Sequence, residues 1–384
     1  MRGIYIHVPF CVRKCSYCDF YSVPASLRWR REYPGLLARE MDLLLARFPE
    51  EAAAGTDTVY FGGGTPTVLG PETLRGLLSA VRERFSIAAG AEVTTEANPG
   101  TVSPGDLTAL REGGFNRISV GAQSFSAGTL RTLGRIHGKE EIRRTIRDAR
   151  SAGFPSVGVD LIFGVPGQTP ASWREDLERA LALSPSHVSA YALAPEPGTP
   201  IHTAIGRGEL RMPSDDEVAE LYEETGTLLP AAGLSRYEIS NFALPGQECR
   251  HNLKYWRRDP YLGFGPSAHG LLFPRDGAPH GLRTENPSSL AEYETSVRKG
   301  HPPWSETCAL TLENAWKESL IFGLRMADGV DLREIEKRIG APPESLRGAV
   351  DALVASGMLR SEGDRLRLPD RLFFVSNEVF ARLA

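Results

Sequence analysis

Three cysteines close together near the start of the chain are the residues best suited to chemistry. Cys11, Cys15 and Cys18 follow a C-x3-C-x2-C spacing, and the whole chain of 384 residues has only five cysteines. Three thiolates on one short loop suit a metal centre that keeps a further coordination position open. An iron–sulfur cubane held by three cysteines has one iron without a protein ligand, and that iron can bind a small molecule. The spacing therefore predicts an iron–sulfur cluster that does chemistry as well as carrying electrons.

The spacing alone leaves other uses of these cysteines open. A structural zinc site normally takes four ligands in two separated pairs, so it would need His7 or Asp19 to complete the set. Thiols that are reactive or simply buried are a further alternative. A disulfide framework needs an even number of thiols and an oxidising compartment. Because the segment ahead of the first strand is too short for a secretory signal, we expect a cytoplasmic protein.

The composition is that of a globular protein with a substantial core. Hydrophobic residues make up 41% and charged residues 24% of the chain, which is ordinary for a globular domain. The net charge of -4 argues against a general nucleic-acid binder, so we expect no nucleic acid among the partners. We also expect no transmembrane segment, because no apolar run approaches the roughly 20 residues of a membrane span.

The first two thirds of the chain alternate β-rich runs with amphipathic helical stretches. Repeated βα units predict a parallel sheet with right-handed crossovers, and six units are too few for a closed eightfold barrel. We therefore expect an α/β fold with a partial (β/α)6 barrel of the TIM type. The expected strands are Ile4–Val8, Thr58–Phe61, Glu92–Thr95, Arg117–Val120, Val157–Ile162 and Val188–Leu193. The expected helices are Trp29–Phe48, Pro71–Phe85, Pro104–Glu112, Ser126–Leu133, Lys139–Ala152 and Pro170–Ala182.

Polar or glycine-rich motifs follow nearly every expected strand. Parallel sheets build their sites at the carboxyl ends of strands, so these motifs should meet at one mouth. Carboxylates there suit ribose hydroxyls or an amino group, and an arginine can hold a carboxylate in a bidentate fork. Taken singly, each side chain is also compatible with a helix cap or an ion pair. Together they predict a pocket for a molecule that joins an amino acid to a nucleoside, formed by Gly62–Thr67, Glu96, Gln123, Arg135 and Asp160.

The chain changes character after about Arg236. Gly233–Gly265 is loop-rich and Pro274–Pro303 is rich in Pro, Gly and His, and we expect a mostly helical, winged-helix-like domain after them. The expected helices of that domain are Leu310–Met326, Leu332–Ile339, Glu344–Ser356 and Asn377–Leu383, with a hairpin turn at Glu362-Gly363-Asp364. These patterns divide the chain into a core domain at 1–236, a connecting segment at 237–305 and a C-terminal domain at 306–384. A winged helix leaves DNA binding by an iron–sulfur sensor as a weaker alternative to a lid or docking domain.

The motifs together resemble the radical S-adenosylmethionine (SAM) superfamily, and more closely the family of oxygen-independent coproporphyrinogen III oxidase and its relatives. The lead-in Tyr5-Ile6-His7-Val8-Pro9-Phe10 is typical of that family, and the resemblance covers almost the whole chain. It implies that the three cysteines hold a [4Fe-4S] cluster and that SAM binds the open iron. The residues that it places around SAM are Tyr5, Tyr17, Gly63, Gly64, Thr65, Glu96, Gln123, Arg135, Asp160 and Ala192.

Two differences separate this chain from the oxidases of that family. The oxidases have a fourth cysteine two residues after the third, where this chain has Phe20, and they carry an extension ahead of the first strand. The segment His251–Trp256 looks like the H-N-x-x-Y-W signature of the heme-chaperone branch. This likeness implies heme as a ligand, with His251 on the heme iron and with Tyr255 and Trp256 beside the macrocycle. On chemistry alone, a loop histidine beside core aromatics is the simpler interpretation.

The expected function is therefore that of a heme chaperone, which binds heme and passes it to an acceptor protein. The alternative is an enzyme, a coproporphyrinogen III oxidase that decarboxylates propionates, and we assign no catalytic residue. A flavodoxin- or ferredoxin-type electron donor is a further expected partner. Cys249 could assist heme binding or be a small buried residue, and Cys308 is expected to be buried.

Overall fold

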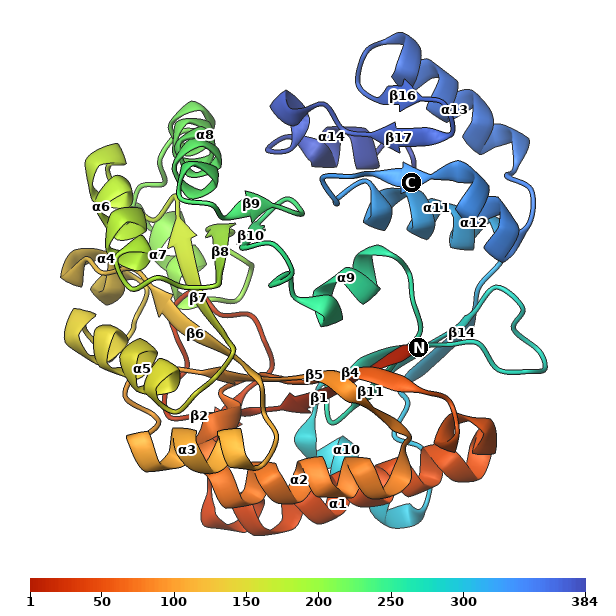
Figure 1. The fold of residues 1–384 in the computed structure, drawn as a ribbon, viewed down its shortest axis with the longest axis horizontal. Coiled ribbons are helices and arrows are strands. Elements are labelled where there is room, and N and C mark those ends of the chain that lie inside the picture. The colour runs from red at the N-terminus through yellow and green to blue at the C-terminus, as the bar shows by residue number, and fades with distance from the viewer.

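The structure is a computed structural model that describes all 384 residues, and one sheet of 12 strands organises it (Figure 1). The centre of this sheet consists of six parallel strands that lie side by side in the order of the sequence. They confirm the six predicted strands and the partial barrel. Their bounds are β1 (Arg2–Val8), β4 (Thr56–Gly63), β5 (Ile87–Ala97), β6 (Arg117–Gln123), β7 (Ser156–Phe163) and β8 (His187–Ala192).

Helices connect these strands and cover one face of the sheet (Figure 1). The apolar residues of α2 recur at helical spacing, so one stripe is buried: Leu74, Leu77, Leu78 and Val81. The six predicted helices are confirmed as α1 (Leu27–Arg47), α2 (Pro71–Arg84), α3 (Pro104–Glu112), α4 (Ala127–Thr132), α5 (Lys139–Ser151) and α6 (Pro170–Leu181). Two helices that the sequence reading missed follow β8, namely α7 (Pro200–Gly206) and α8 (Asp215–Ala231).

Short pieces shape the loop that carries the three cysteines. This cysteine loop, residues 11–22, lies between β2 (Phe10–Cys11) and β3 (Val23–Pro24), which pair in parallel as a separate two-stranded sheet. The pairing closes the loop at its base, so the cysteines are held over the carboxyl ends of the barrel strands. Short 3-10 turns lie elsewhere, at Pro49–Ala52, Pro66–Leu69 and Asp370–Leu372.

The sequence patterns after Arg236 did not show that six short strands between residues 235 and 309 extend the sheet at both edges. Each added strand has only two to four residues, too few to leave a period-two pattern among the Pro-rich and Gly-rich turns. At one edge lie β9 (Ser235–Arg236) and β10 (Asn241–Ala243). At the other lie β11 (Tyr261–Phe264), parallel to β1, and the antiparallel strands β12 (His269–Leu272), β13 (Leu282–Glu285) and β14 (Glu306–Ala309).

Two helices belong to this extension. Helix α9 (Arg250–Trp256) lies between the sheet and the C-terminal helices, and α10 (Leu290–Lys299) packs beside α1 (Figure 1). The expectation that Cys308 is buried is also wrong. Cys308 lies on β14, an edge strand whose four residues are all exposed, so its surroundings do not shield the thiol.

The C-terminal residues form the predicted winged-helix-like domain. Its helices are α11 (Leu312–Gly323), α12 (Leu332–Ile339), α13 (Glu344–Ala355) and α14 (Ser376–Phe380), and its small sheet contains β15 (Val330–Asp331), β16 (Arg360–Glu362) and β17 (Arg365–Arg367). One continuous core of 66 buried apolar residues runs from the barrel into these helices, so the domain is packed on the barrel. The boundaries at 236 and 305 stay a prediction. No helix is long and apolar enough to cross a membrane.

Candidate functional site

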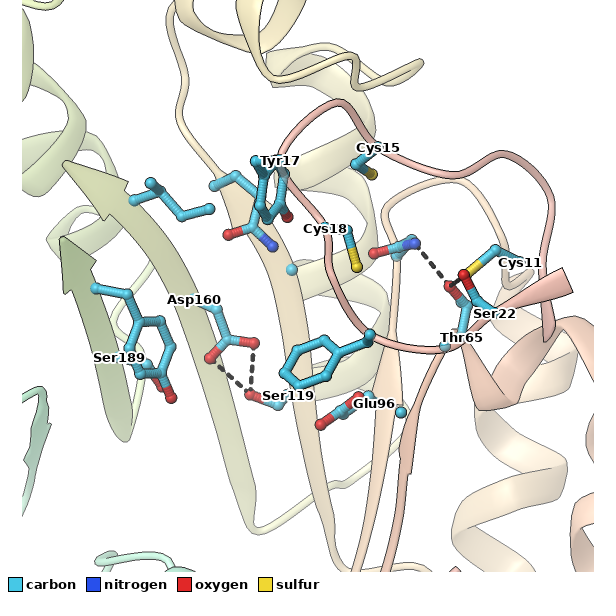
Figure 2. A pocket seen from close by; sticks show the side chains of 18 of the residues that line it. Cys11, Cys15, Tyr17, Cys18, Ser22, Thr65, Glu96, Ser119, Asp160 and Ser189 are labelled. Carbon is cyan, nitrogen blue, oxygen red and sulfur yellow. Dashed lines mark hydrogen bonds between the residues drawn. The ribbon is translucent and has the colours of Figure 1, made fainter. Parts of the chain in front are cut away.

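A cavity of about 460 Å³ opens at the carboxyl ends of the barrel strands, where the strand-end motifs were expected to meet (Figure 2). This main cavity is within the size range of small-molecule sites. The cysteine loop forms one wall and supplies all three predicted metal ligands. Of the ten residues expected around SAM, only Tyr5 is absent from the lining. The nine that line it are Tyr17, Gly63, Gly64, Thr65, Glu96, Gln123, Arg135, Asp160 and Ala192.

A hydrogen-bond network joins two of the cysteines across the main cavity. The Cys11 Sγ lies 3.6 Å from the Thr65 Oγ1, which accepts a hydrogen bond of 2.8 Å from the Asn98 amide. The Arg135 guanidinium donates to the Asn98 Oδ1 at 2.6 Å and to the Cys15 Sγ at 3.3 Å. This network links the cysteine loop to the turn after β4 and to Asn98 and holds Cys11 and Cys15 at the wall of the cavity.

The donor set fits an iron–sulfur cluster better than a single zinc ion. No group of three Cys, His, Asp or Glu side chains is arranged around a single metal ion in the structure. His7, which a zinc site would need, has both ring nitrogens at 3.2 Å from other partners, the Tyr5 hydroxyl and the Tyr21 carbonyl. Burial raises the pKa of Cys18 to about 11, and a bound metal would remove that proton.

The glycine motif after β4 allows two backbone segments to approach closely. Gly63 has φ +103°, and a Cβ added there would lie 2.6 Å from the His7 ring. A Cβ on Gly64 would lie 2.7 Å from the Phe10 carbonyl oxygen. Any other residue would push this turn away from the base of the cysteine loop. The motif therefore fixes the distance between the loop and the cavity wall.

Two buried carboxyl groups face each other across the interior of the barrel. The Tyr60 hydroxyl donates to Glu96 at 2.7 Å, and the Ser119 hydroxyl lies 2.9 and 3.0 Å from the two oxygens of Asp160 (Figure 2). The pKa of Glu96 is raised to about 7, mainly by burial and also by repulsion from Asp160. Burial also raises the pKa of Asp160. A cationic ligand would stabilise both ionised forms.

Gln123 enters the main cavity from a distorted strand end. The register between β6 and β7 shifts at Gly121 and Gln123, and Gln123 has φ +63°, a value that residues other than glycine rarely adopt. Such a bulge turns a side chain in a new direction, and strained backbone of this kind gathers at functional sites. The local strain is therefore consistent with a binding role for this amide.

The three residues expected at the heme lie apart from the main cavity. They belong to α9 at the amino-terminal end of the barrel, and from this part of the chain only Cys249, before the helix, and Asn252, within it, line the main cavity. His251 is 1% exposed, and its ring nitrogens lie 2.8 Å from the Thr58 and Tyr255 hydroxyls. Burial, with a smaller contribution from Lys254, lowers the pKa of His251 to about 3. The ring is therefore neutral.

The other two members of that motif, and Tyr5, are also held within the protein. The rings of Tyr5 and Tyr60 stack with centroids 6.1 Å apart, between His7 and His251. The guanidinium carbon of Arg325 lies over the ring of Trp256, 4.5 Å from the ring centroid. The buried Nε1 of Trp256 has no hydrogen-bond partner.

Several cavity residues were missed by the sequence reading. Asn98 joins the network of Cys11 and Cys15, while Ser119 supports Asp160. A period-two reading of β6 would have found Ser119, because it lies two residues before Gly121 and four before Gln123 on the same face. The missed lining residues include Tyr60, Asn98, Arg117, Ser119, His187, Ser189 and Tyr191.

Comparison with known proteins gives the same assignment over the whole length. Residues 5–180 match the family model described as Radical SAM superfamily, and residues 310–374 match the HemN C-terminal domain. The chain is similar to the heme chaperone HemW of Mycobacterium tuberculosis, with 38% identity over 96% of this chain and 91% of the relative. HemW of Bacillus subtilis is 33% identical over 99% of this chain and 98% of its own length.

A solved structure shows the same fold. Coproporphyrinogen III oxidase (HemN) of Escherichia coli superposes with a TM-score of 0.82 over 100% of this chain and 90% of that one, at 24% identity. At this identity the likeness concerns the fold alone. The cysteine spacing, the barrel, the C-terminal domain and the full-length relatives agree. The chain belongs to the radical SAM superfamily and, within it, to the family of the heme chaperones HemW.

Proposed function

We propose that this protein is a heme chaperone that carries a [4Fe-4S] cluster and an exchangeable SAM. The observation that carries the proposal is its similarity, over nearly the full length, to relatives named heme chaperone HemW. The main cavity supports the cofactors, since three thiols and a ligand-sized space with two carboxyl groups lie at one mouth. Cys11, Cys15 and Cys18 would hold the cluster. With SAM bound, the cluster would supply one electron to the sulfonium of SAM.

The residues of the main cavity then have separate tasks. Arg135 holds Cys15 and Asn98 in place and presents a positive charge to the carboxylate of SAM. Glu96 and Asp160 provide negative charge for the amino group and hydroxyl acceptors for the ribose. Gln123 and Ala192 close the sides of the same cavity. Tyr5 would act from behind the wall, through His7, rather than by direct contact.

Heme binding by His251 requires a local rearrangement. In the structure the Nε2 of His251 is hydrogen-bonded to the Tyr255 hydroxyl, and the ring is enclosed by Tyr60. Iron would have to replace the Tyr255 hydroxyl, which would leave Tyr255 and Trp256 free to lie against the macrocycle. Because the pKa of His251 is already far below neutrality, its imidazole is in the form that binds iron.

The alternative, coproporphyrinogen III oxidase, has less support in the site. The position where the oxidases have a fourth cysteine is Phe20, and this ring is 62% exposed at the rim of the main cavity. An exposed phenylalanine can contact an apolar ligand or partner, but it cannot ligate metal. The proposed activity is therefore transfer of heme rather than oxidation of a porphyrinogen.

The proposal includes two protein partners, a heme acceptor and an electron donor of the flavodoxin or ferredoxin type. Cys15 lies at the wall of the main cavity and also lines a small outer groove with Val12, Arg13 and Ile136. Val12 and Ile136 are each 61% exposed, so an apolar and basic surface lies next to the expected cluster. Such a surface suits an acidic electron carrier. We place these events in the reducing cytoplasm, where thiols remain available for metal.

One paired experiment tests the proposal against its alternative. The cluster is reconstituted anaerobically, and the protein is titrated with heme while a second sample receives coproporphyrinogen III, SAM and a reductant. We expect stoichiometric heme binding and no protoporphyrinogen. The Cys15→Ala variant should lose the bound iron, as measured by iron analysis. It should keep its fold, as measured by circular dichroism. Turnover of coproporphyrinogen would contradict the chaperone and establish the oxidase.

A further inference from the structure

A second, strongly charged cavity lies on the outer side of α9. It has a volume of about 410 Å³, and it is formed where the start of β1, the C-terminal end of α9 and helix α12 meet. Six of its eight lining residues are charged, and the other two are Met1 and Pro260. We call it the basic cavity, after its four cationic side chains: Arg250, Lys254, Arg257 and Arg338.

The charges of the basic cavity do not balance. Against four cationic side chains there are two carboxylates, Asp57 and Asp259. Asp57 pairs with Lys254 at 2.6 Å and with Arg250 at 3.3 Å, and Asp259 lies 3.5 Å from Arg338. The guanidinium of Arg257 has no hydrogen bond or ion pair, and the chain as a whole is negative. A concave surface with surplus positive charge concentrates anions.

His251 lies directly behind the wall of the basic cavity. A Cβ built on Gly3 would lie 3.0 Å from the Lys254 Cδ and 3.1 Å from the His251 Cε1, so these two side chains meet at the start of β1. Lys254 is 6% exposed and donates to the Met1 carbonyl oxygen at 3.1 Å. Only this lysine stem and the first residues of β1 separate the imidazole from the basic cavity.

We infer that the basic cavity binds the two carboxylates of a porphyrin whose iron is held by His251. This inference rests on the proposed function and adds the residues that recognise the propionate side chains. The charged lining suits carboxylates and not an apolar macrocycle, so the macrocycle would lie beside this cavity, where the contacts of His251 with Tyr255 rearrange. Arg257 supplies the free guanidinium, and Arg250 and Arg338 supply two more that exchange part of their present contacts for the ligand.

The test compares heme with its dimethyl ester, in which both carboxylates are masked. The reconstituted full-length protein is titrated with each compound, and binding is followed by heme absorbance. We expect Arg257→Ala to weaken heme binding about tenfold, the usual effect of one charge-assisted hydrogen bond. Binding of the ester should not change. Arg347→Ala is the matched control, because Arg347 is exposed on α13 and far from this cavity in the fold.

The outcomes separate this inference from the proposed function. Equal weakening of heme and ester in Arg257→Ala, or no weakening of either, would overturn the carboxylate site while leaving heme binding in place. The charge reversal Arg257→Glu should weaken heme more than Arg257→Ala and still leave the ester unchanged. If the unaltered protein binds neither compound, the proposed function itself fails.

Discussion

Glu96 is a single residue whose burial has a direct consequence for ligand binding. Burial raises the pKa of its carboxyl group to about 7, so the group is mostly neutral below that pH. A cationic ligand such as SAM binds the ionised form, and binding below the pKa must therefore release a proton. We expect the association constant to rise with pH, by at most about tenfold per unit below pH 7, and to level off above it. Calorimetric titration of the cluster-loaded protein with SAM between about pH 6 and 8 measures this.

Glu96→Gln is the matched variant for that prediction, since it keeps the shape and the hydrogen bond from Tyr60 but removes the titrating group. Its affinity should be lower above pH 7 and nearly independent of pH. A pH profile that stays unchanged in Glu96→Gln would assign the titration to another group, of which Asp160 is the nearest candidate, since its pKa is raised by burial as well.

Helix α9 carries the proposed heme ligand His251, and a carboxylate of the barrel holds the start of this helix. The Glu92 carboxylate accepts hydrogen bonds from the backbone N–H groups of Arg250 and His251, at 3.1 and 3.0 Å. It therefore acts as the cap of this short helix. Cys249, directly before the helix, is 2% exposed, and burial raises the pKa of its thiol to about 12. This cysteine is unreactive for as long as α9 stays in place.

Cys249 would report whether the rearrangement proposed at His251 also moves α9. We expect iodoacetamide to label the exposed Cys308 with or without heme, whereas Cys249 should be labelled only when heme is present, as measured by peptide mass spectrometry. Glu92→Gln weakens the cap by about 1 kcal/mol, so Cys249 should be labelled about fivefold faster without heme. Glu248→Gln, which leaves the α9 amides unaffected, should behave like the unaltered protein. Heme binding without any change at Cys249 would contradict the movement of α9.

The βα units of the barrel show how much of the fold the sequence could predict. All six central strands were predicted, and for the first five a helical pattern after the strand supported the prediction. The helices α7 and α8 that follow the sixth strand, β8, were not predicted. Strand β11 is four residues long and wholly buried, and its pairing with β1 joins segments about 250 residues apart in the sequence. Local patterns carry no information about such a pairing. Glycines and charged residues at strand ends predicted where the main cavity lies and part of its lining, because parallel strands end together.

The prediction for α9 had a different limit. The motif His251–Trp256 was visible in the sequence, but its burial under the barrel was not, because tertiary contacts with Thr58 and Tyr60 decide it. A histidine with two polar partners looks the same in a sequence as a histidine that is free to bind iron. For heme to bind His251 as proposed, these contacts would have to rearrange, and the motif alone does not contain that requirement.

For the whole molecule, a small set of charges joins the sheet extension to the C-terminal domain. Glu318 of α11 pairs with Arg258 at 2.8 Å and with Arg283 at 2.9 Å, and Arg258 is 1% exposed. Removing a shared carboxylate leaves two cations without a partner, one of them buried. We expect Glu318→Ala to lower the free energy of unfolding by about 3 kcal/mol, measured by urea denaturation.

Glu313→Ala is the control on the same helix. Its partner Lys317 lies at 3.1 Å, but both side chains are partly exposed to water, so the loss should stay below about 1 kcal/mol. Equal effects of the two variants would mean that the junction is held by apolar packing alone and that the charges at Glu318 contribute little.

The central claim, that this protein binds heme through His251, is tested most directly by the optical spectrum of the ferric heme complex. The unaltered protein should give the spectrum of a histidine-ligated heme at one equivalent. His251→Ala should lose that spectrum and regain it when imidazole is added, while Tyr255→Phe, which removes the competing hydroxyl, should bind heme at least as tightly. An unchanged spectrum and affinity in His251→Ala would contradict the account and place the heme iron on another residue.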